Sequence, residues 1–353
     1  MALAFVLWTL VIIAVLLAMG AQLAIQEGRA VRRERSGERA QSRAEAGIAA
    51  ILTAWTPAKL SRQLPSPFDS LVLPPGIGWL GRIHRLNEGL FLLDVSGTDS
   101  LAQARLGRLV RSHPLRVSPA AALATRGPVS LGAGSVVIGF GGGASLGDSC
   151  SVGDSGVAGV ASGGPVTLTD DARVAGATPI VTRSAAQDSV AAMTDGLVFE
   201  ELARQATVSV GGGSWAPAPA LTGGRCDSAP STNWGDPLTE TGACSAYVPI
   251  IHITGDALLL GGDGQGILLV DGDLDVSGSF HFGGLVLVRG KLLPHPAGGQ
   301  LQVTGGLVAG GVGPIGGSVT GLTVIYSKCF IQKALRTSGT LSPLPSRSWK
   351  RLF

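Results

Sequence analysis

The aspartates of the run Asp271-Gly272-Asp273-Leu274-Asp275 are the residues whose types and spacing best suit chemistry in this chain. Alternate residues of a strand share one face, so the pattern would place the three carboxylates together. Such a group suits Ca²⁺ binding, and paired acids on a β-helix suit cleavage of glycosidic bonds. The simpler interpretation is a solvated outer face bordered by turns, which the neighbouring glycines favour. We therefore predict no catalytic residue, no metal site and no cofactor.

Other motifs that carry enzyme chemistry are missing from the sequence. The five histidines are scattered, without cysteine or carboxylate partners at ligand spacing, and no CxxC motif occurs, which argues against zinc. A GxGxxG-like string at 261–266 precedes a predicted strand and not a helix, so it does not indicate phosphate binding. GxSxG and HExxH motifs are also absent. We expect that this protein is not an enzyme.

Cysteines supply the one covalent prediction. Cys226 and Cys244 bracket a polar loop that contains the sequence NWGDP, and we predict that they form a disulfide. Closing a loop of this length stabilises a protein by about 3 kcal/mol in the chain-entropy model. Cys150 and Cys329 remain, each beside a predicted strand. They either pair with each other or act as small buried apolar residues.

The composition describes many short strands joined by tight turns. Glycine supplies 53 of 353 residues without a strict three-residue period, and charged residues make up only 14%. The formal net charge is +3, and it comes mostly from the arginines of residues 29–43 and from the tail, residues 328–351. No basic stripe with interleaved aromatic residues occurs between them, so nucleic acid is not an expected partner.

The elements that must position these residues begin with a long N-terminal helix. Residues 1–25 are apolar except for Gln22. This run is long enough to cross a bilayer, and we predict that it is a retained membrane anchor. A cleaved signal peptide and a buried soluble helix are the alternatives. The helical signal continues through an arginine-rich segment to Trp55, and Pro57 ends it.

Two faces of this predicted helix have separate roles. Past the anchor, one apolar stripe at helical spacing would dock on the chain's own β domain; it consists of Ile48, Ile51, Leu52 and Trp55. Within the anchor, a second set would contact neighbouring subunits; it consists of Leu3, Val6, Leu10 and Leu17. The arginines after the anchor favour a cytoplasmic location by the positive-inside rule, whereas four cysteines and a glycine-rich body favour the oxidising side.

The rest of the chain is predicted to be mainly β. Residues 1–56 form the anchor and helix, and residues 57–126 form a small α+β unit with a hairpin at 87–89 and a helix at 100–111. Short strand pairs then recur over 127–335, and we predict a glycine-rich β-solenoid with an insertion at 183–249. A β-sandwich is the alternative. Ile331, Ala334 and Leu335 would form a short closing helix before the tail, 336–353.

Two parts of the sequence resemble a known family. The apolar run, the arginine-rich helix and Ala44-Glu45-Ala46-Gly47 are similar to the N-terminus of PilX-like minor pilins and of type II secretion minor pseudopilins. Unlike most pilins, the chain has no Glu near the fifth anchor position. Residues 264–290, the NWGDP loop and the YSKC string near the end resemble the β-solenoid segment of large glycine-rich pilus-assembly proteins. The resemblance implies a pilus-assembly subunit without catalytic residues.

We therefore expect a non-catalytic structural subunit of a type IV pilus or a type II secretion system. Its expected partners are the membrane and pilin-like subunits, and its expected location is the inner membrane, single-pass, with the body in the periplasm or at the cell surface. A bactofilin-like or adhesin-like solenoid scaffold is the second hypothesis. A β-helix enzyme acting on polysaccharides is the third.

Overall fold

The computed structural model describes most of the chain: residues 2–64, 68–87, 89–117, 119–141, 156–169, 171–182, 190–191, 193–194, 196–239, 241–294, 298–313, 317–344 and 349–352. The side chains of residues 2–7, 9–12, 14, 61, 197, 294 and 349–352 lie outside this description. Two compact units divide the chain. We call 1–54, 66–111 and 342–353 the helix–sheet unit, and 55–65 with 112–341 the parallel-sheet unit.

Helix α1 (Ala2–Ala54) is the longest element of the helix–sheet unit and follows the predicted helical signal. Its 53 residues contain many alanines, leucines and arginines, which are good helix formers. It ends before Thr56, whose hydroxyl accepts a hydrogen bond from the Lys59 amide. That contact caps the next helix, α2 (Pro57–Gln63), with proline at its first position.

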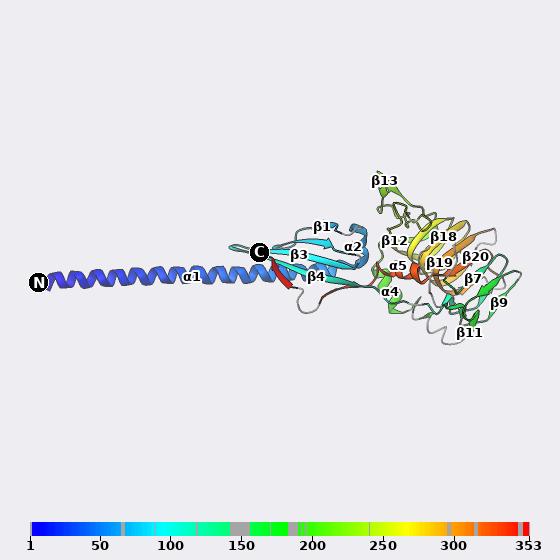
Figure 1. Cartoon of the computed structure of the whole chain (residues 1–353), viewed down its shortest axis with the longest axis horizontal. Coiled ribbons are helices and arrows are strands. Elements are labelled where there is room, and N and C mark those ends of the chain that lie inside the picture. Colours follow the sequence, from blue (N-terminus) through cyan, green and yellow to red (C-terminus); the bar gives the residue numbers. More distant parts are fainter. Residues whose placement is uncertain are drawn as a thin grey trace. The chain divides into compact units, whose positions relative to one another are not determined.

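The helix–sheet unit also contains an antiparallel sheet that begins β1-β2-β3-β4, with β21 and β22 paired to β4 (Figure 1). The strands are β1 (Ser70–Val72), β2 (Trp79–Arg85), β3 (Leu90–Asp99), β4 (Ala102–His113), β21 (Thr340–Pro343) and β22 (Trp349–Leu352). The predicted hairpin around Asn87 joins β2 to β3, and the Asn87 side chain accepts a hydrogen bond from the Gly89 amide. The predicted helix at 100–111 is wrong, because this segment is strand β4.

The burial pattern of β4 gives the physical reason for that error. Ala104, Leu106 and Val110 are buried, and they lie an even number of residues apart, as in a strand with one face on a core. Leu101, within the segment predicted to be a helix, is exposed. A short apolar segment of this kind fits both the helical period and the two-residue period of a strand. Pairing with a neighbouring strand decides between them.

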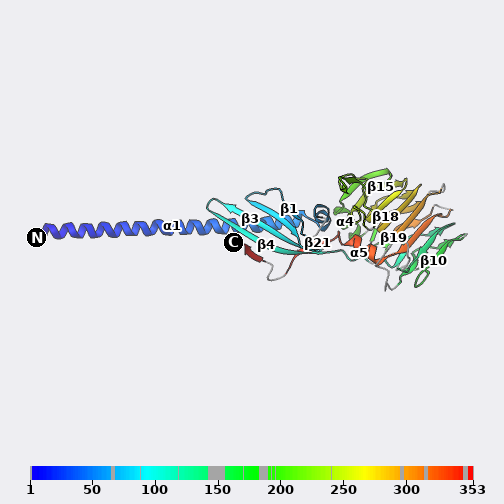
Figure 2. The ribbon, with the colours of Figure 1, turned by 45° about the horizontal axis from the view of Figure 1, so that its top comes forward.

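The parallel-sheet unit is built on a 14-stranded sheet whose described strands pair in parallel (Figure 2). Its main path has the order β10-β7-β20-β19-β18-β16-β15-β12. The strands on this path are β10 (Arg173–Ala175), β7 (Val136–Ile138), β20 (Leu322–Tyr326), β19 (Gln300–Val312), β18 (Ser279–Pro294), β16 (Gly262–Val270), β15 (Ile250–Leu259) and β12 (Val208–Trp215). The others are β5 (Ala121–Thr125), β6 (Val129–Leu131), β8 (Ala158–Ser162), β9 (Val166–Leu168), β11 (Ile180–Thr182) and β17 (Leu274–Val276).

The core of this unit comes from apolar residues that stack in rows across the strands. In one row Leu268 pairs with Val286, Val286 with Leu307 and Leu307 with Leu123. All four side chains are buried. Parallel strands that are covered on both faces have such continuous apolar segments, because no position faces water. The short runs between glycines in the sequence supply these rows.

The fold-class prediction is wrong about the body. In the predicted β-solenoid, successive turns of the chain stack in order. Here early strands lie on late ones, since β7 pairs with β20 and β5 pairs with β19. In addition, β15, β16, β18 and β17 form a closed circuit of four parallel strands, and further strands branch from the main path. Sequence spacing identified the short strands but not which strands become neighbours.

The fold-class prediction also included a membrane-spanning helix, and this part is not supported. Within the described residues, no helix has a stretch that is long and apolar enough to cross a bilayer.

Two short helices of the parallel-sheet unit bury apolar side chains, and the second is the predicted closing helix. Helix α4 (Leu197–Arg204) buries Phe199 and Leu202. Helix α5 (Lys328–Leu335) buries the predicted set Ile331, Ala334 and Leu335. Ser327 caps α5, because its hydroxyl accepts a hydrogen bond from the Phe330 amide.

Candidate functional site

The first half of helix α1 carries large apolar side chains that remain exposed. Figures 1 and 2 show α1 running well past the ends of the strands of its own unit. Trp8 is 71% exposed and Leu17 is 69% exposed. Others of this kind are Ile13, Val15, Leu16, Met19, Leu23, Ile25 and Val31. Among the predicted subunit contacts, Leu17 belongs to this set, whereas the side chains of Leu3, Val6 and Leu10 lie outside the described residues.

The second half of α1 packs on strand β3 through small residues. Ala40 and Ala44 are fully buried. A Cβ atom built on Gly97 of β3 would lie 2.0 Å from the Ala40 carbonyl oxygen, so only glycine permits this approach. Gly47 makes a similar contact, because a Cβ there would lie 2.7 Å from the Trp79 ring. The small residues of the Ala44–Gly47 motif therefore let the helix lie close to the sheet.

The predicted docking stripe falls partly on this interface. Ile48 and Ile51 are each 2% exposed, and Leu52 is half-buried. Trp55 follows the last residue of α1, belongs to the parallel-sheet unit and is half-buried. The helical part of the stripe therefore ends at Leu52, because α1 stops one residue before Trp55.

A polar clamp holds the middle of α1 to the β3–β4 turn. The Ser36 hydroxyl donates to an Asp99 carboxylate oxygen at 3.0 Å and accepts from the Leu101 amide at 3.1 Å. Arg43 forms an ion pair with Asp99 at 2.9 Å. The Ser36 hydrogen bond and the Arg43 charge lower the pKa of Asp99 below its ordinary value of 3.8. Sequence reasoning missed this clamp, because 63 residues separate Ser36 from Asp99; Gly97, inside a strand, was the available signal.

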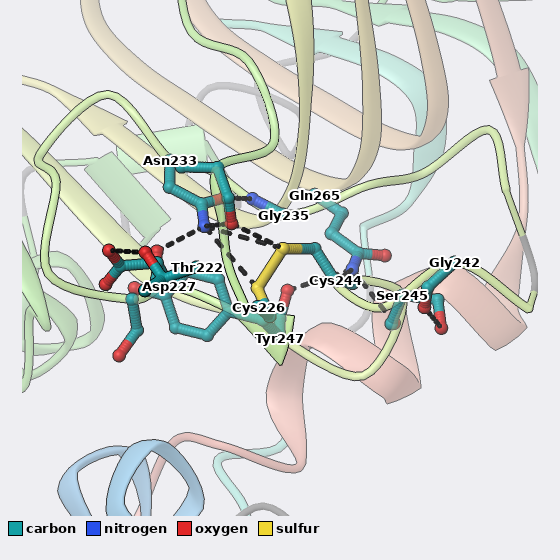
Figure 3. Close-up of a disulfide and its surroundings, with 12 residues drawn as sticks. Thr222, Cys226, Asp227, Asn233, Gly235, Gly242, Cys244, Ser245, Tyr247 and Gln265 are labelled. Atoms are coloured by element: carbon teal, nitrogen blue, oxygen red, sulfur yellow. Dashed lines mark hydrogen bonds between the residues drawn. A yellow bond between two sulfur atoms is a disulfide. The ribbon is translucent and has the colours of Figure 1, made fainter. Parts of the chain in front are cut away.

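Cys226 and Cys244 form the predicted disulfide in the parallel-sheet unit (Figure 3). It joins β14 (Arg225–Cys226) to the following loop, and β14 pairs with β13 (Leu221–Thr222). Cys329 is also disulfide-bonded. The sequence left the pairing of Cys329 with Cys150 open, and Cys150 lies outside the described residues.

Asn233 is the polar centre of the loop that the disulfide closes. It is fully buried, and its amide nitrogen donates to the Asp227 carbonyl at 2.6 Å, while its carbonyl oxygen accepts from the Gly235 amide at 2.9 Å (Figure 3). Gly235 has a φ of +83°, a conformation that favours glycine. Trp234 between them is fully buried, with its ring edge-on to Phe280. The NWGDP sequence thus has a structural role, because its Asn233 and Trp234 side chains are buried in the core.

Gln265 ties the same loop to the sheet. Its amide nitrogen lies within 3.0 Å of the carbonyl oxygens of Cys244, Ser245 and Tyr247, and its own oxygen accepts from Lys333 at 3.0 Å. The side chain is almost completely buried. A buried amide with these partners fixes the path of the loop, because an unpaired one would destabilise the core.

The aspartates at 271, 273 and 275 do not act as one group. Asp271 contacts His252 and Arg289, each at 3.1 Å. An Asp273 carboxylate oxygen accepts from the Lys291 amide at 2.7 Å. The expected shared strand face is wrong, because Asp271 and Asp273 lie in the turn before β17 and only Asp275 lies in that strand. Within the described part of the chain, no group of His, Cys, Asp and Glu side chains is arranged to hold a metal ion.

Arg289 connects Asp271 to helix α4. Its guanidinium lies 4.0 Å from the Phe199 ring centroid, donates to the Thr194 carbonyl at 2.8 Å and pairs with Glu200. The Arg289 hydrogen bond and charge lower the pKa of Glu200. Arg289 and Asp271 are half-buried and Glu200 is exposed. Because the three charged groups already pair with one another, the cluster holds α4 in place.

Comparisons with known proteins give little further information. No family model matches the chain, and no curated protein matches it. Among solved structures, the competence-associated pilin ComZ from Thermus thermophilus is similar at 13% identity, over 89% of this chain and 97% of that chain, with a TM-score of 0.23. At that TM-score the similarity carries no argument about this chain.

Proposed function

We propose that this chain is a non-catalytic, pilin-like structural subunit that assembles through the first half of helix α1. The observation that carries the proposal is the division of α1, whose second half is buried on its own sheet while the first half exposes large apolar side chains. Apolar residues exposed along the first half of a long helix indicate a contact surface. Side-by-side packing against similar helices would cover them.

The resemblance of the N-terminal segment to minor pilins and pseudopilins supports the same role. Its motif Ala44–Gly47 lies where α1 approaches β3, so the part of the sequence that resembles the family also forms the interface between helix and sheet. The proposal includes a PilX-like role in a type IV pilus or a type II secretion system. It also includes an inner-membrane location, which fractionation of cells tests.

A photo-cross-linking residue at Leu16 tests the assembly role. In cells we expect adducts with pilin-like subunits, because Leu16 is 63% exposed on the proposed contact surface. The same residue at Leu260, which is 52% exposed on the parallel-sheet unit, is the matched control and should give no such adducts. Adducts of Leu16 with lipid or with the same chain only, together with normal piliation and secretion after gene deletion, would contradict the proposal.

A location outside the cytoplasm is the second part of the proposal. Disulfides persist in oxidising compartments, and the Cys226–Cys244 bond closes the loop that carries the buried Asn233 and Trp234. Peptide mapping without reduction, on protein taken from cells after thiol blocking, should find the two cysteines linked. Blocked free thiols at both positions would place the body in the cytoplasm.

The absence of catalysis is proposed from the roles of the acidic residues. Asp271 forms an ion pair with Arg289, and Asp273 accepts a hydrogen bond from the Lys291 amide. Both contacts connect parts of the fold. Asp271→Asn and Asp273→Asn should therefore change stability without removing any glycan-cleaving activity. A measurable hydrolytic activity that both substitutions abolish would instead support an enzyme.

A further inference from the structure

A row of polar side chains crosses the outer face of the parallel sheet. The strand register pairs Asp263 of β16 with His281 of β18, His281 with Gln302 of β19, and Gln302 with Thr323 of β20. Each is half-buried, and the residues after it in the strands are buried. Because side chains alternate between the faces of a strand, the row points away from the core.

Three members of this row, His281, Gln302 and Thr323, line a groove of about 480 Å³. Its polar side chains come from Ser279, His281, Gln300, Gln302, Thr320 and Thr323, and Ala133 and Leu301 are its apolar lining residues. Glycines 134, 298, 299 and 321 complete the wall and leave backbone within reach of a ligand. None of the described residues that line the groove is Asp, Glu, Lys or Arg. The volume lies in the range of small-ligand sites, about 300–1,000 Å³.

Several hydrogen-bonding groups in the groove are available to a ligand. Asp263 accepts a hydrogen bond from Nδ1 of His281 at 3.1 Å, because an ionised carboxylate can only accept. This contact leaves the other ring nitrogen, Nε2, directed away from Asp263. The Gln302 amide and the Thr323 hydroxyl have no hydrogen-bond partner among the described residues. Gln300 makes one long contact, 3.5 Å, with Ser279. Amides and hydroxyls offer donors and acceptors together.

We propose that this groove binds a segment of a neutral polysaccharide. Sugar hydroxyls both donate and accept hydrogen bonds, which matches a lining of amides, hydroxyls and an imidazole. Neighbouring strands lie about 4.8 Å apart, so the row repeats at a spacing close to that of successive sugar rings in an extended chain. A linear glycan running across β18, β19 and β20 would meet one polar side chain on each strand.

Other classes of ligand fit the groove less well. Phosphates and nucleic acids are bound by arginine and lysine, which do not line it. An added β-strand needs a sheet edge, whereas β18, β19 and β20 each pair on both sides. The proposed site is independent of assembly through α1, so it extends the proposed function and does not rest on it.

Titration of the full-length chain with cellohexaose and chitohexaose tests the site. The protein is held in lauryldimethylamine oxide, a detergent without a sugar head group, because α1 exposes apolar residues. Hexagalacturonate and a single-stranded DNA hexamer are the anionic probes. We expect binding of at least one neutral hexasaccharide, monitored by calorimetry, and no binding of either anionic probe.

Paired substitutions then locate the binding. Gln302→Ala and Thr323→Ala together should weaken binding about tenfold or more, because each removes a hydrogen-bonding group from the ligand. Gln332→Ala with Thr167→Ala makes the same changes at exposed positions of α5 and β9, and should bind like the wild type. Thermal unfolding verifies that both variants fold, and Gln302→Glu is used instead if the first variant does not.

Three results would overturn the proposal: no binding of either neutral hexasaccharide, unchanged affinity in the folded Gln302 variant, or preferential binding of an anionic probe. Each leaves the assembly role of α1 intact, since cross-linking at Leu16 is measured separately.

Discussion

Within helix α1, residues 36–51 face strand β3 through serine, alanine, glycine and isoleucine, whereas residues 15–31 present leucine, methionine and valine to solvent. The buried half uses small residues because the β3 backbone lies within contact distance of the helix backbone. The exposed half uses large residues, which suit a surface formed with other helices of similar shape. One continuous helix thus carries two contact surfaces. Residues 36–51 pack on the sheet of the same chain, and residues 15–31 form the surface proposed to contact a partner.

The largest effect is expected from a charge on the exposed half. Leu17→Arg should abolish incorporation into a filament or secretion assembly, because an unpaired charge buried between helices destabilises the contact by several kcal/mol. Co-purification of the variant with pilin-like subunits measures incorporation. Gln26→Arg, which adds the same charge at a polar exposed position, is the control and should assemble. Normal incorporation of the Leu17 variant would remove the distinction between the halves.

An apolar truncation on each half sharpens the comparison. Ile51→Ala should lower the free energy of unfolding of the helix–sheet unit by about 2–5 kcal/mol, because Ile51 is 2% exposed. Leu17→Ala should change it by less than about 0.5 kcal/mol. Denaturant unfolding, with hydrogen exchange of the peptides covering residues 36–51, measures both. Equal effects would show that the exposed half also packs within the chain.

A pair of glycine substitutions separates close approach from helix propensity. Gly97→Ala should destabilise the helix–sheet unit by about 1–3 kcal/mol, because the new Cβ meets the Ala40 carbonyl at 2.0 Å. Gly37→Ala in α1 has open space and should stabilise it by about 0.5–1 kcal/mol. Denaturant unfolding of both variants compares them. A neutral result for Gly97 would show that helix and strand separate readily.

The smallest effect is expected from pH. The pKa of Asp99 is lower in the folded state than in the unfolded chain, so its contribution is present above the unfolded value and is lost as the pH falls through the folded one. Exchange protection of residues 36–43 should therefore decrease between about pH 5 and about pH 3. Asp99→Asn should reduce that pH dependence. An unchanged profile in this variant would assign the acid response to other groups.

Local features of the sequence gave reliable predictions where one segment determines the outcome. Residues 2–54 form a helix because good helix formers continue without proline until Pro57. Helix α5 buries Ile331, Ala334 and Leu335 because they lie on one helical face. The Cys226–Cys244 bond follows from two cysteines that bracket one loop. None of these depends on a distant partner.

Predictions that needed distant partners were wrong or incomplete. Strand β4 has a pattern compatible with a helix until β3 pairs with it. The stacking order of the body was wrong, because β7 pairs with β20, about 190 residues later in the chain. The polar row from Asp263 to Thr323 was not found, since each member comes from a different strand.

The sequence by itself determined the long helix, the short apolar strands, the disulfide and the absence of familiar catalytic motifs, because these depend on local period and spacing. Only the tertiary structure decided which strands become neighbours, which polar groups hold α1 to its sheet and where Gly97 permits close contact. It also decided that the aspartates at 271–275 separate while His281, Gln302 and Thr323 align. The physical reason is that strand register and backbone approach are set by pairing between distant segments, which one-dimensional spacing does not record.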